Sequence, residues 1–117
     1  QLVEKIKSHC AACGVEVTVY QSNHEGDLVD RIQWAYGKCD GIVLNPGAYT
    51  HTSIALLDAL KAVSIPAVEV HISKLAEREA FRQISYVRLA CEKTLTGHGT
   101  DGYTEAIDYL RTRGMGA

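Results

Sequence analysis

Three chemically active side chains alternate along the stretch PAVEVHIS, residues 66–73. Glu69, His71 and Ser73 stand two residues apart, and aliphatic residues fill the positions between them. Because residues two apart on a β-strand share a face, we expect the carboxylate and the imidazole to lie side by side. A carboxylate next to a histidine fixes its tautomer, which suits a general acid. Ser73, taken alone, is better explained as the cap of a following helix than as a ligand for a substrate carboxylate.

A second polar set follows the short apolar stretch Gly41–Asn45, GIVLN. Pro46 keeps Asn45 extended, so that the amide projects beyond the end of a strand, and Gly47 permits a close approach of the backbone to a ligand. His51 stands just ahead of the next helix. Ligands of open parallel sheets bind beyond the carboxyl ends of the strands. We therefore predict that the side chains of both sets point into one hollow.

Arg78 and Arg82 share one face of an expected helix through their i, i+4 spacing. Two interpretations are open: a solvated face whose charge Glu77 and Glu79 offset, or a pair that faces an anionic or hydroxyl-rich ligand. The spacing alone favours neither of them.

Cysteine spacing bears on thiol and metal chemistry. Cys10 and Cys13 form a CxxC motif near the end of an expected helix that stops at Gly14, whereas a redox pair normally opens a helix. Small apolar side chains on a helix face are the favoured interpretation, and a thiol-redox or metal protein is the weaker alternative. The histidines form no HxH or HExxH motif, so no metal site is predicted and His9 is given no role. No GxGxxG or Walker motif occurs, so neither a dinucleotide nor ATP is predicted.

The composition sets the broad class of the protein. Its 117 residues predict a single domain over 1–117. Twelve basic and fourteen acidic side chains leave a net charge of −2 without a long basic run, which argues against nucleic acid as the main partner. The sequence shows no secretory signal and no apolar run of membrane length, so we predict a cytoplasmic protein without a membrane partner.

Hydrophobic periodicity divides the chain into alternating helices and strands. Helices are expected over residues 1–13, 27–36, 52–63, 74–83 and 103–113, and strands over residues 15–20, 41–45, 67–72 and 93–97. This alternation predicts an α/β fold, with a parallel sheet and helices on both faces. The first expected element is a helix, whereas such folds usually enter by a central strand. We therefore expect that a first strand and the loop after it are absent from this sequence.

Five blocks of the sequence closely resemble type II 3-dehydroquinate dehydratases, in the same order: QSNHEGDLVDRIQWA, GIVLNPGAYTHTSIALLDAL, PAVEVHIS, REAFR and GTDGY. The resemblance covers nearly the whole chain, and the block NPGAYTHTSIAL is highly specific. It implies a flavodoxin-like three-layer α/β/α sandwich and a homo-oligomer, in which trimers assemble into a dodecamer. It also implies that the reaction uses no metal and no organic cofactor.

The family removes water from 3-dehydroquinate by an anti elimination through an enolate, giving 3-dehydroshikimate in the shikimate pathway. The resemblance makes His71 the general acid and Glu69 the residue that orients it, while Asn45 helps to bind the substrate and the water that stabilises the enolate. Substrate-binding roles are implied for the other matched positions: His51 and Arg82 for hydroxyl groups, Ile72 and Ser73 for the carboxylate, Arg78, Gly47 and Ala48 near the site, and Asp58 for the site of a neighbouring subunit.

The sequence departs from the family at its start. The family begins with a strand and a mobile lid, which carries PNLNLLG and an Arg-x-x-x-x-Tyr-Gly segment and supplies a tyrosine base with its activating arginine. None of the six tyrosines of this sequence matches that motif, so none is assigned as the base. The leading hypothesis is a dehydratase whose activity is impaired, and the alternative is a catalytically inactive module that binds a hydroxylated carboxylate.

Overall fold

The computed structural model describes residues 1–72 and 85–113, apart from the side chain of Ala48. The strands are β1 (Ile42–Leu44), β2 (Ala67–His71) and β3 (Lys93–Thr96). The α-helices are α1 (Leu2–Cys13), α2 (Glu25–Trp34), α3 (Ile54–Val63) and α4 (Asp101–Thr112), and the short 3-10 helices are η1 (Gly47–His51) and η4 (Val87–Ala90). The helix predicted over residues 74–83 lies outside the described residues, as do Ser73, Arg78 and Arg82.

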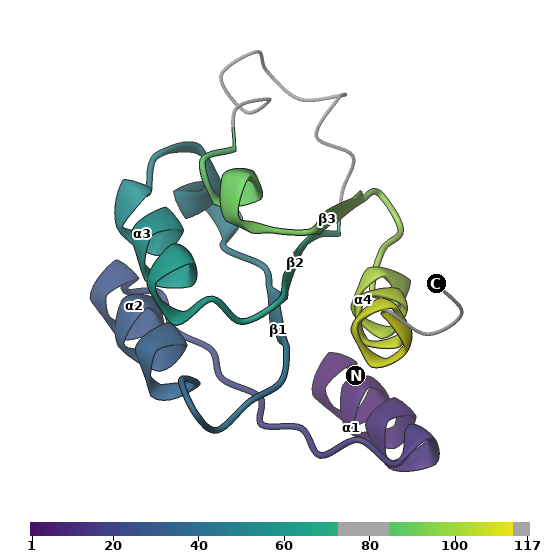
Figure 1. Ribbon diagram of the computed structural model, residues 1–117. Helices are drawn as coiled ribbons and strands as arrows, with labels where there is room; N and C mark the ends of the chain where they lie inside the picture. The colour runs from purple at the N-terminus through teal and green to yellow at the C-terminus, as the bar shows by residue number, and fades with distance from the viewer. Residues whose placement is uncertain (73–84, 114–117) are drawn as a thin grey trace.

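The three described strands form one parallel sheet in the order β1-β2-β3. Its register places Leu44 of β1 and Thr94 of β3 level with Glu69 of β2. Helices α2 and α3 lie on one side of this sheet, and α1 and α4 lie on the other (Figure 1). This arrangement confirms the predicted α/β fold with a parallel sheet between two helical layers.

Strand β2 is buried on both faces because each face meets a helical layer. Val68 and Val70 pack with Leu95 and Ala106 on the α4 side, whereas Ala67 belongs to the core beneath α2 and α3. A strand with covered faces favours continuous apolar sequence, as in parallel sheets generally. The polar residues of β2 therefore occupy positions that would ordinarily be apolar.

Capping residues set the helix boundaries, which agree with the prediction at the end of α1 and differ from it by two residues at the start of α3. Gly14 ends α1 in the left-handed conformation, with φ 73°, and its N–H bonds to carbonyls of the last turn. Helix α3 begins at Ile54 and not at Thr52, because the side chain of Ser53 accepts a hydrogen bond from the N–H of Leu56 (2.9 Å).

The strand predicted over residues 15–20 is absent, because these residues pair with no strand in the described part of the chain. An alternating valine pattern stabilises a strand only where a neighbour accepts and donates its backbone hydrogen bonds. No described strand pairs with the outer side of β1, which forms one edge of the sheet. Val17 and Tyr20 are consequently 38% and 46% exposed, and the guanidinium of Arg31 lies 5.1 Å from the centre of the Tyr20 ring.

None of the helices in the described part of the chain combines the length and the apolar character that a membrane-spanning segment needs.

Candidate functional site

Glu69 and His71 lie side by side on β2, as their spacing of two residues predicts. The ring Nε2–H of His71 donates a hydrogen bond to Oε2 of Glu69. The carboxylate is completely buried and the imidazole is only 6% exposed. Both side chains point to the α3 side of the sheet, since Val68 and Val70 occupy the α4 side.

Two hydroxyl groups hold the Glu69 carboxylate in addition to His71. The Oγ1 of Thr50 donates to Oε2 (3.0 Å), and the Oγ of Ser85 donates to Oε1 (2.9 Å). Thr50 belongs to η1 and Ser85 precedes η4, so the carboxylate joins β2 to two loops. The same loops are also joined by the N–H of Tyr86, which donates to the C=O of Thr50 (2.9 Å).

The hydrogen bonds around Glu69 determine its charge. Burial alone would raise the pKa of this carboxyl, but the hydrogen bond and positive charge of His71, with the hydroxyls of Ser85 and Thr50, outweigh burial and lower the pKa below its usual value. Glu69 is therefore ionised at neutral pH. An ionised, immobile carboxylate at Nε2 fixes the His71 ring, and Nδ1 is the nitrogen that faces away from the carboxylate.

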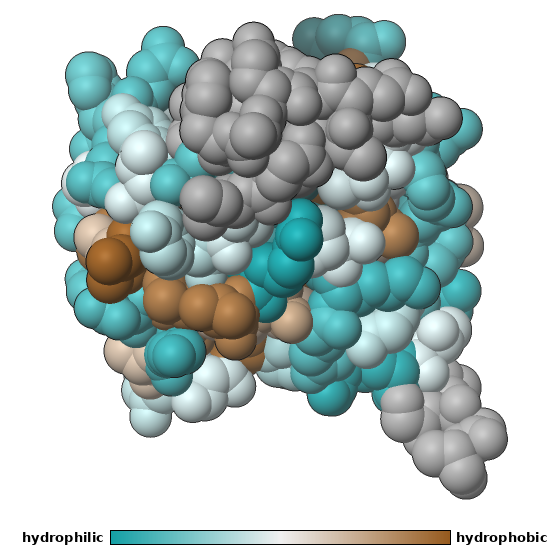
Figure 2. Space-filling model, turned by 90° about the horizontal axis from the view of Figure 1, so that it is seen from above, coloured by the Kyte–Doolittle hydropathy of each residue, from teal (hydrophilic) through white to brown (hydrophobic). Residues whose placement is uncertain are grey.

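The end of β2 is fastened to the loop after β3. The N–H of Gly97 donates to the C=O of His71 (3.2 Å), and the N–H of Gly99 donates to the C=O of Ile72 (3.1 Å). Both glycines have positive φ angles, 76° and 59°, which glycine adopts without strain. The Ile72 side chain is 44% exposed. Figure 2 looks onto this end of the molecule, where hydrophilic surface borders a hydrophobic area.

Asn45 is directed to the other side of the sheet from His71. Leu44 packs into the core under α3, so the next residue points to the α4 side. There the Nδ2 of Asn45 donates to the hydroxyl oxygen of Tyr103 (2.8 Å), and its Oδ1 accepts the N–H of Gly47 (3.1 Å). The structure therefore brings Glu69 and His71 together but does not bring the Asn45 amide to them, contrary to the single hollow expected from the sequence.

The remaining described candidates lie around the same strand ends. His51 is the last residue of η1 and directly follows Thr50. Gly47 is exposed and has a φ of 58°, and Asp58 lies on the exposed side of α3.

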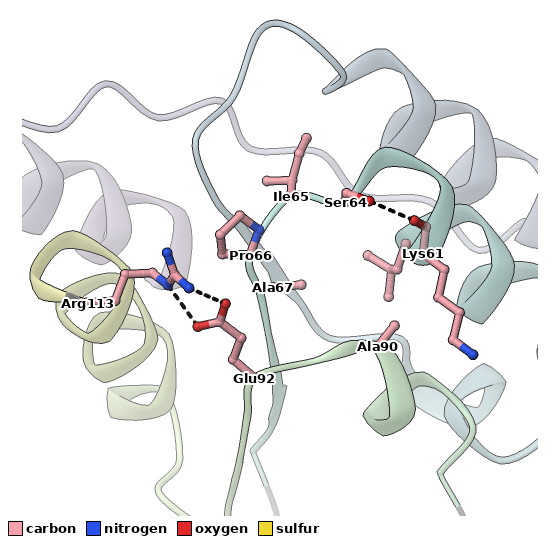
Figure 3. A pocket seen from close by; sticks show the side chains of 9 residues that line it. Lys61, Ser64, Ile65, Pro66, Ala67, Ala90, Glu92 and Arg113 are labelled. Atoms are coloured by element: carbon pink, nitrogen blue, oxygen red, sulfur yellow. Dashed lines mark hydrogen bonds and ion pairs between the residues drawn. The ribbon is translucent and has the colours of Figure 1, made fainter.

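A hollow of about 430 Å³ lies at the opposite end of β2, where Pro66 and Ala67 enter the strand (Figure 3). Its rim carries Lys61 and an ion pair in which the Nε of Arg113 donates to Oε1 of Glu92 (2.8 Å). Ligands of parallel sheets bind at the carboxyl ends of the strands, so we place the candidate site at His71 and not in this hollow.

Sequence reasoning missed Thr50 and Ser85, which hold the central carboxylate. A buried carboxylate requires hydrogen-bond donors. The position of Glu69 on a covered strand therefore predicts that donors surround it. The sequence alone did not say which of the many hydroxyl residues in the loops would supply them.

Most of the chain matches one family of known proteins. Residues 1–111 match the family model described as dehydroquinase class II. The catabolic 3-dehydroquinase of Phaeosphaeria nodorum is 52% identical over 109 residues, which cover 93% of this chain and 72% of that relative. The 3-dehydroquinate dehydratase of Bartonella tribocorum is 46% identical over 114 residues, 94% of this chain and 76% of that relative. The crystal structure of type II dehydroquinase from Butyrivibrio crossotus superposes with a TM-score of 0.92 at 52% identity, covering 94% of this chain and 77% of that one.

Proposed function

The chain belongs to the class II dehydroquinase family and has its flavodoxin-like α/β fold, and from this premise we propose that it is a hydro-lyase that removes water from 3-dehydroquinate with His71 as the general acid. The product is 3-dehydroshikimate. The observation that carries the assignment of the acid is the buried hydrogen bond between His71 and the ionised Glu69.

The geometry supports one route for the proton that leaves with water. Glu69 occupies Nε2 of His71, so the proton for the departing hydroxyl comes from Nδ1. The protonated ring loses this proton as the C–O bond breaks, and the Glu69 carboxylate keeps its hydrogen bond to Nε2 throughout. Thr50 and Ser85 prevent the carboxylate from rotating with the ring. The base that removes the C2 proton is not assigned to any described residue.

Substrate binding is proposed for residues around the same strand end. The exposed Ile72, with Ser73, binds the substrate carboxylate, while His51 binds a hydroxyl group and Gly47 and Ala48 line the site. Arg78 and Arg82, outside the described residues, complete it. Asn45 binds substrate after exchanging its hydrogen bond with Tyr103.

We also propose that the chain forms trimers, four of which make a dodecamer. The support for this proposal is the family resemblance of the sequence, and Asp58 lies on the exposed side of α3, where a neighbouring copy can contact it. Sedimentation analysis tests the assembly, and a monomer at micromolar concentration would contradict it.

A dehydration assay tests the activity. Addition of 3-dehydroquinate should produce the ultraviolet absorbance of a conjugated enone carboxylate. Replacement of His71 by Ala should lower kcat by about 10²–10⁴-fold, the usual contribution of a general acid. The matched control is His98→Ala, since His98 also bonds to a glutamate (Nδ1 to Oε2 of Glu105, 2.6 Å) but is exposed. A His71→Ala variant that turns over as fast as the wild type would refute the assignment of His71 as the acid.

A second candidate is a binding module that recognises the same ligand without converting it. The observation that favours it is the hydrogen bond from Asn45 to Tyr103. This bond holds the Asn45 amide on the side of the sheet away from His71. Calorimetry distinguishes the two: saturable binding of 3-dehydroquinate without any enone absorbance would establish the binding module and exclude the dehydratase.

A further inference from the structure

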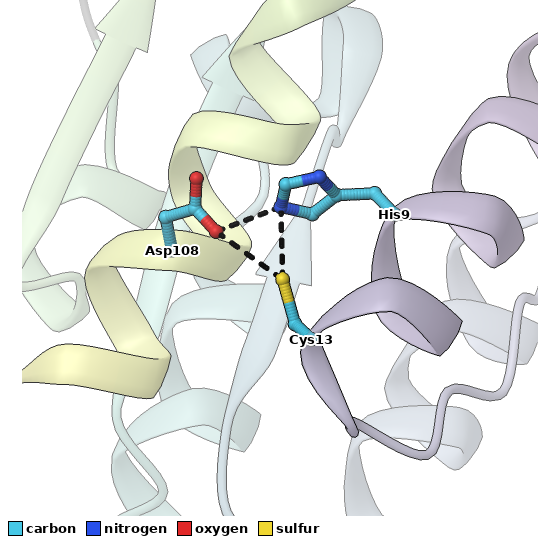
Figure 4. Close-up of side chains that lie close together, drawn as sticks. All are labelled: His9, Cys13 and Asp108. Atoms are coloured by element: carbon cyan, nitrogen blue, oxygen red, sulfur yellow. Dashed lines mark hydrogen bonds and ion pairs between the residues drawn. The ribbon is translucent and has the colours of Figure 1, made fainter.

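Three potential metal ligands converge between α1 and α4. His9 and Cys13 extend from α1 and Asp108 from α4, and their side chains point toward one another (Figure 4). The Nε2 of His9 lies 2.7 Å from Oδ1 of Asp108 and 3.7 Å from Sγ of Cys13. The Sγ of Cys13 lies 4.0 Å from the same Asp108 oxygen. All three side chains are partly exposed, so an ion in solution has access to them.

This arrangement is not that of a Cys-His-Asp catalytic triad. In a triad the carboxylate and the nucleophile contact different nitrogens of the imidazole, so that the ring relays between them. Here the carboxylate and the thiol both face Nε2 of His9. Convergence of an N, an S and an O atom on one point is the arrangement that a metal ion requires.

The helices present these side chains in a fixed geometry. His9 and Cys13 are four residues apart and therefore share a helix face, which is the spacing of the two histidines in helical zinc motifs. Beneath them, Ile6 and Cys10 of α1 pack against Ile107 of α4. An ion pair between Lys5 and Asp101 joins the same two helices. The ligands therefore need little rearrangement to bind an ion.

We propose that His9, Cys13 and Asp108 form a binding site for a divalent ion of the zinc class, with water as the fourth ligand. Bonds of about 2.0–2.3 Å around a tetrahedral zinc ion separate its ligand atoms by about 3.3–3.7 Å. The observed separations are 2.7, 3.7 and 4.0 Å, and small side-chain movements convert them into those of a tetrahedral site. A mixed imidazole, thiolate and carboxylate set favours zinc or cobalt over magnesium or calcium.

Two neighbours bear on this site. The Nη2 of Arg111 lies 4.0 Å from Oδ1 of Asp108, but its side chain is 43% exposed and can turn to solvent when an ion binds. Cys10, the other cysteine of the CxxC motif, is buried among apolar residues. The structure thus assigns His9 a ligand role that its sequence context did not indicate, and it separates Cys10 from Cys13.

The site is independent of the proposed dehydratase site. The cluster lies between α1 and α4, whereas Glu69 and His71 point to the α3 side of the sheet. An ion that binds both α1 and α4 binds the folded chain in preference to the unfolded one, so it raises the melting temperature, and the stabilisation grows with the logarithm of its free concentration over Kd. The site therefore has a stabilising function that does not depend on turnover.

Cobalt(II) titration of the reduced full chain, in a phosphine reductant that spares the metal, tests the site. The wild type should develop a thiolate-to-cobalt charge-transfer band and tetrahedral d–d bands at one equivalent, and Cys13→Ser should lose the charge-transfer band. Competition with a chromophoric chelator should then give a zinc Kd that rises at least about tenfold in Cys13→Ser and in His9→Gln, because even the loss of an outer-shell partner costs about 10–100-fold.

Two controls make the test specific. Cys39→Ser removes a partly exposed thiol outside the cluster, and His98→Gln removes a surface histidine that bonds to a carboxylate without a thiol. Both should bind cobalt and zinc as the wild type does, and zinc at a given concentration should raise their melting temperatures by more than that of Cys13→Ser. The proposal is overturned if the wild type gives no thiolate band, if Cys13→Ser keeps it, or if His9→Gln binds zinc with unchanged Kd. Circular dichroism verifies the fold of each variant, and Cys13→Ser conserves side-chain size.

Discussion

Oε2 of Glu69 accepts a hydrogen bond from Nε2 of His71 inside the protein. Both side chains are buried, so water does not solvate a charge on either of them. Such a pair is costly to bury and is tolerated only when further hydrogen bonds satisfy the carboxylate. Thr50 and Ser85 provide them. The strand end at which we place the reaction therefore also contributes to the pH dependence of stability.

Acid should destabilise the wild type through Glu69. Its folded-state pKa is lower than its value of about 4.3 in an unfolded chain, so the unfolded chain binds the proton first. The contribution to stability is present above the unfolded pKa and is lost as pH falls through the lower folded pKa. Urea unfolding from pH 7 downward should show this loss in the wild type and not in Glu69→Gln.

The control for this measurement is Glu105→Gln, which removes an exposed carboxylate that also contacts a histidine. Its stability should follow the wild-type pH profile. Equal acid sensitivity of Glu69→Gln and the wild type would show that Glu69 does not carry the effect.

Thr50→Val should destabilise the protein by about 1–3 kcal/mol, because it leaves a buried carboxylate oxygen with one donor fewer at almost unchanged volume. The free energy of unfolding from urea titration measures the loss. Thr18→Val, at an exposed position in the unpaired segment 15–20, should change the free energy by less than about 0.5 kcal/mol. A Thr50→Val protein as stable as the wild type would show that Ser85 and His71 satisfy the carboxylate alone.

The sequence predicts those features that depend on neighbours along the chain. The alternation in β2 puts Glu69 beside His71, and Gly14 marks the end of α1 through local capping hydrogen bonds. These features need only the geometry of one strand or one helix. The parallel sheet follows from the order of the elements, since parallel strands require crossover helices.

The remaining features depend on partners that are distant in sequence. Residues 15–20 have a strand pattern, but pairing requires a second strand that the described chain does not place there. The direction of Asn45 depends on which face Leu44 occupies and on Tyr103, 58 residues away. His9 has no metal-binding motif of its own, because Asp108 comes from another helix.

Cys91 should resist alkylation well above the pH at which ordinary thiols react. Burial and the negative charge of Glu69 raise the pKa of its thiol to about 12, against a smaller lowering by the positive charge of Arg88. The thiolate is the nucleophile, so iodoacetamide at pH 9 should modify Cys91 about 10²–10³-fold more slowly in the folded protein than in urea. Peptide mass spectrometry follows Cys91 and the partly exposed Cys39 in the same sample. Equal rates for Cys91 in the folded and unfolded protein would contradict the raised pKa.

The hydrogen bond between Asn45 and Tyr103 gives a test of the role that Asn45 has in the proposed dehydratase. Tyr103→Phe removes the oxygen that accepts from Nδ2 of Asn45 and should cost about 0.5–1.5 kcal/mol of stability. Tyr109→Phe is the matched control on α4, because its hydroxyl bonds to Glu92 at the other end of the helix.

If Asn45 serves the proposed dehydratase, Tyr103→Phe frees its amide for the substrate. The value of kcat/KM should then equal or exceed that of the wild type, whereas Asn45→Ala should lower it by at least about tenfold, the effect expected when a polar substrate contact is lost. Steady-state kinetics on the three variants gives the answer. A Tyr103→Phe enzyme slowed as much as Asn45→Ala would mean that the tyrosine hydroxyl itself takes part in the reaction, and that the amide is functional where the structure now holds it.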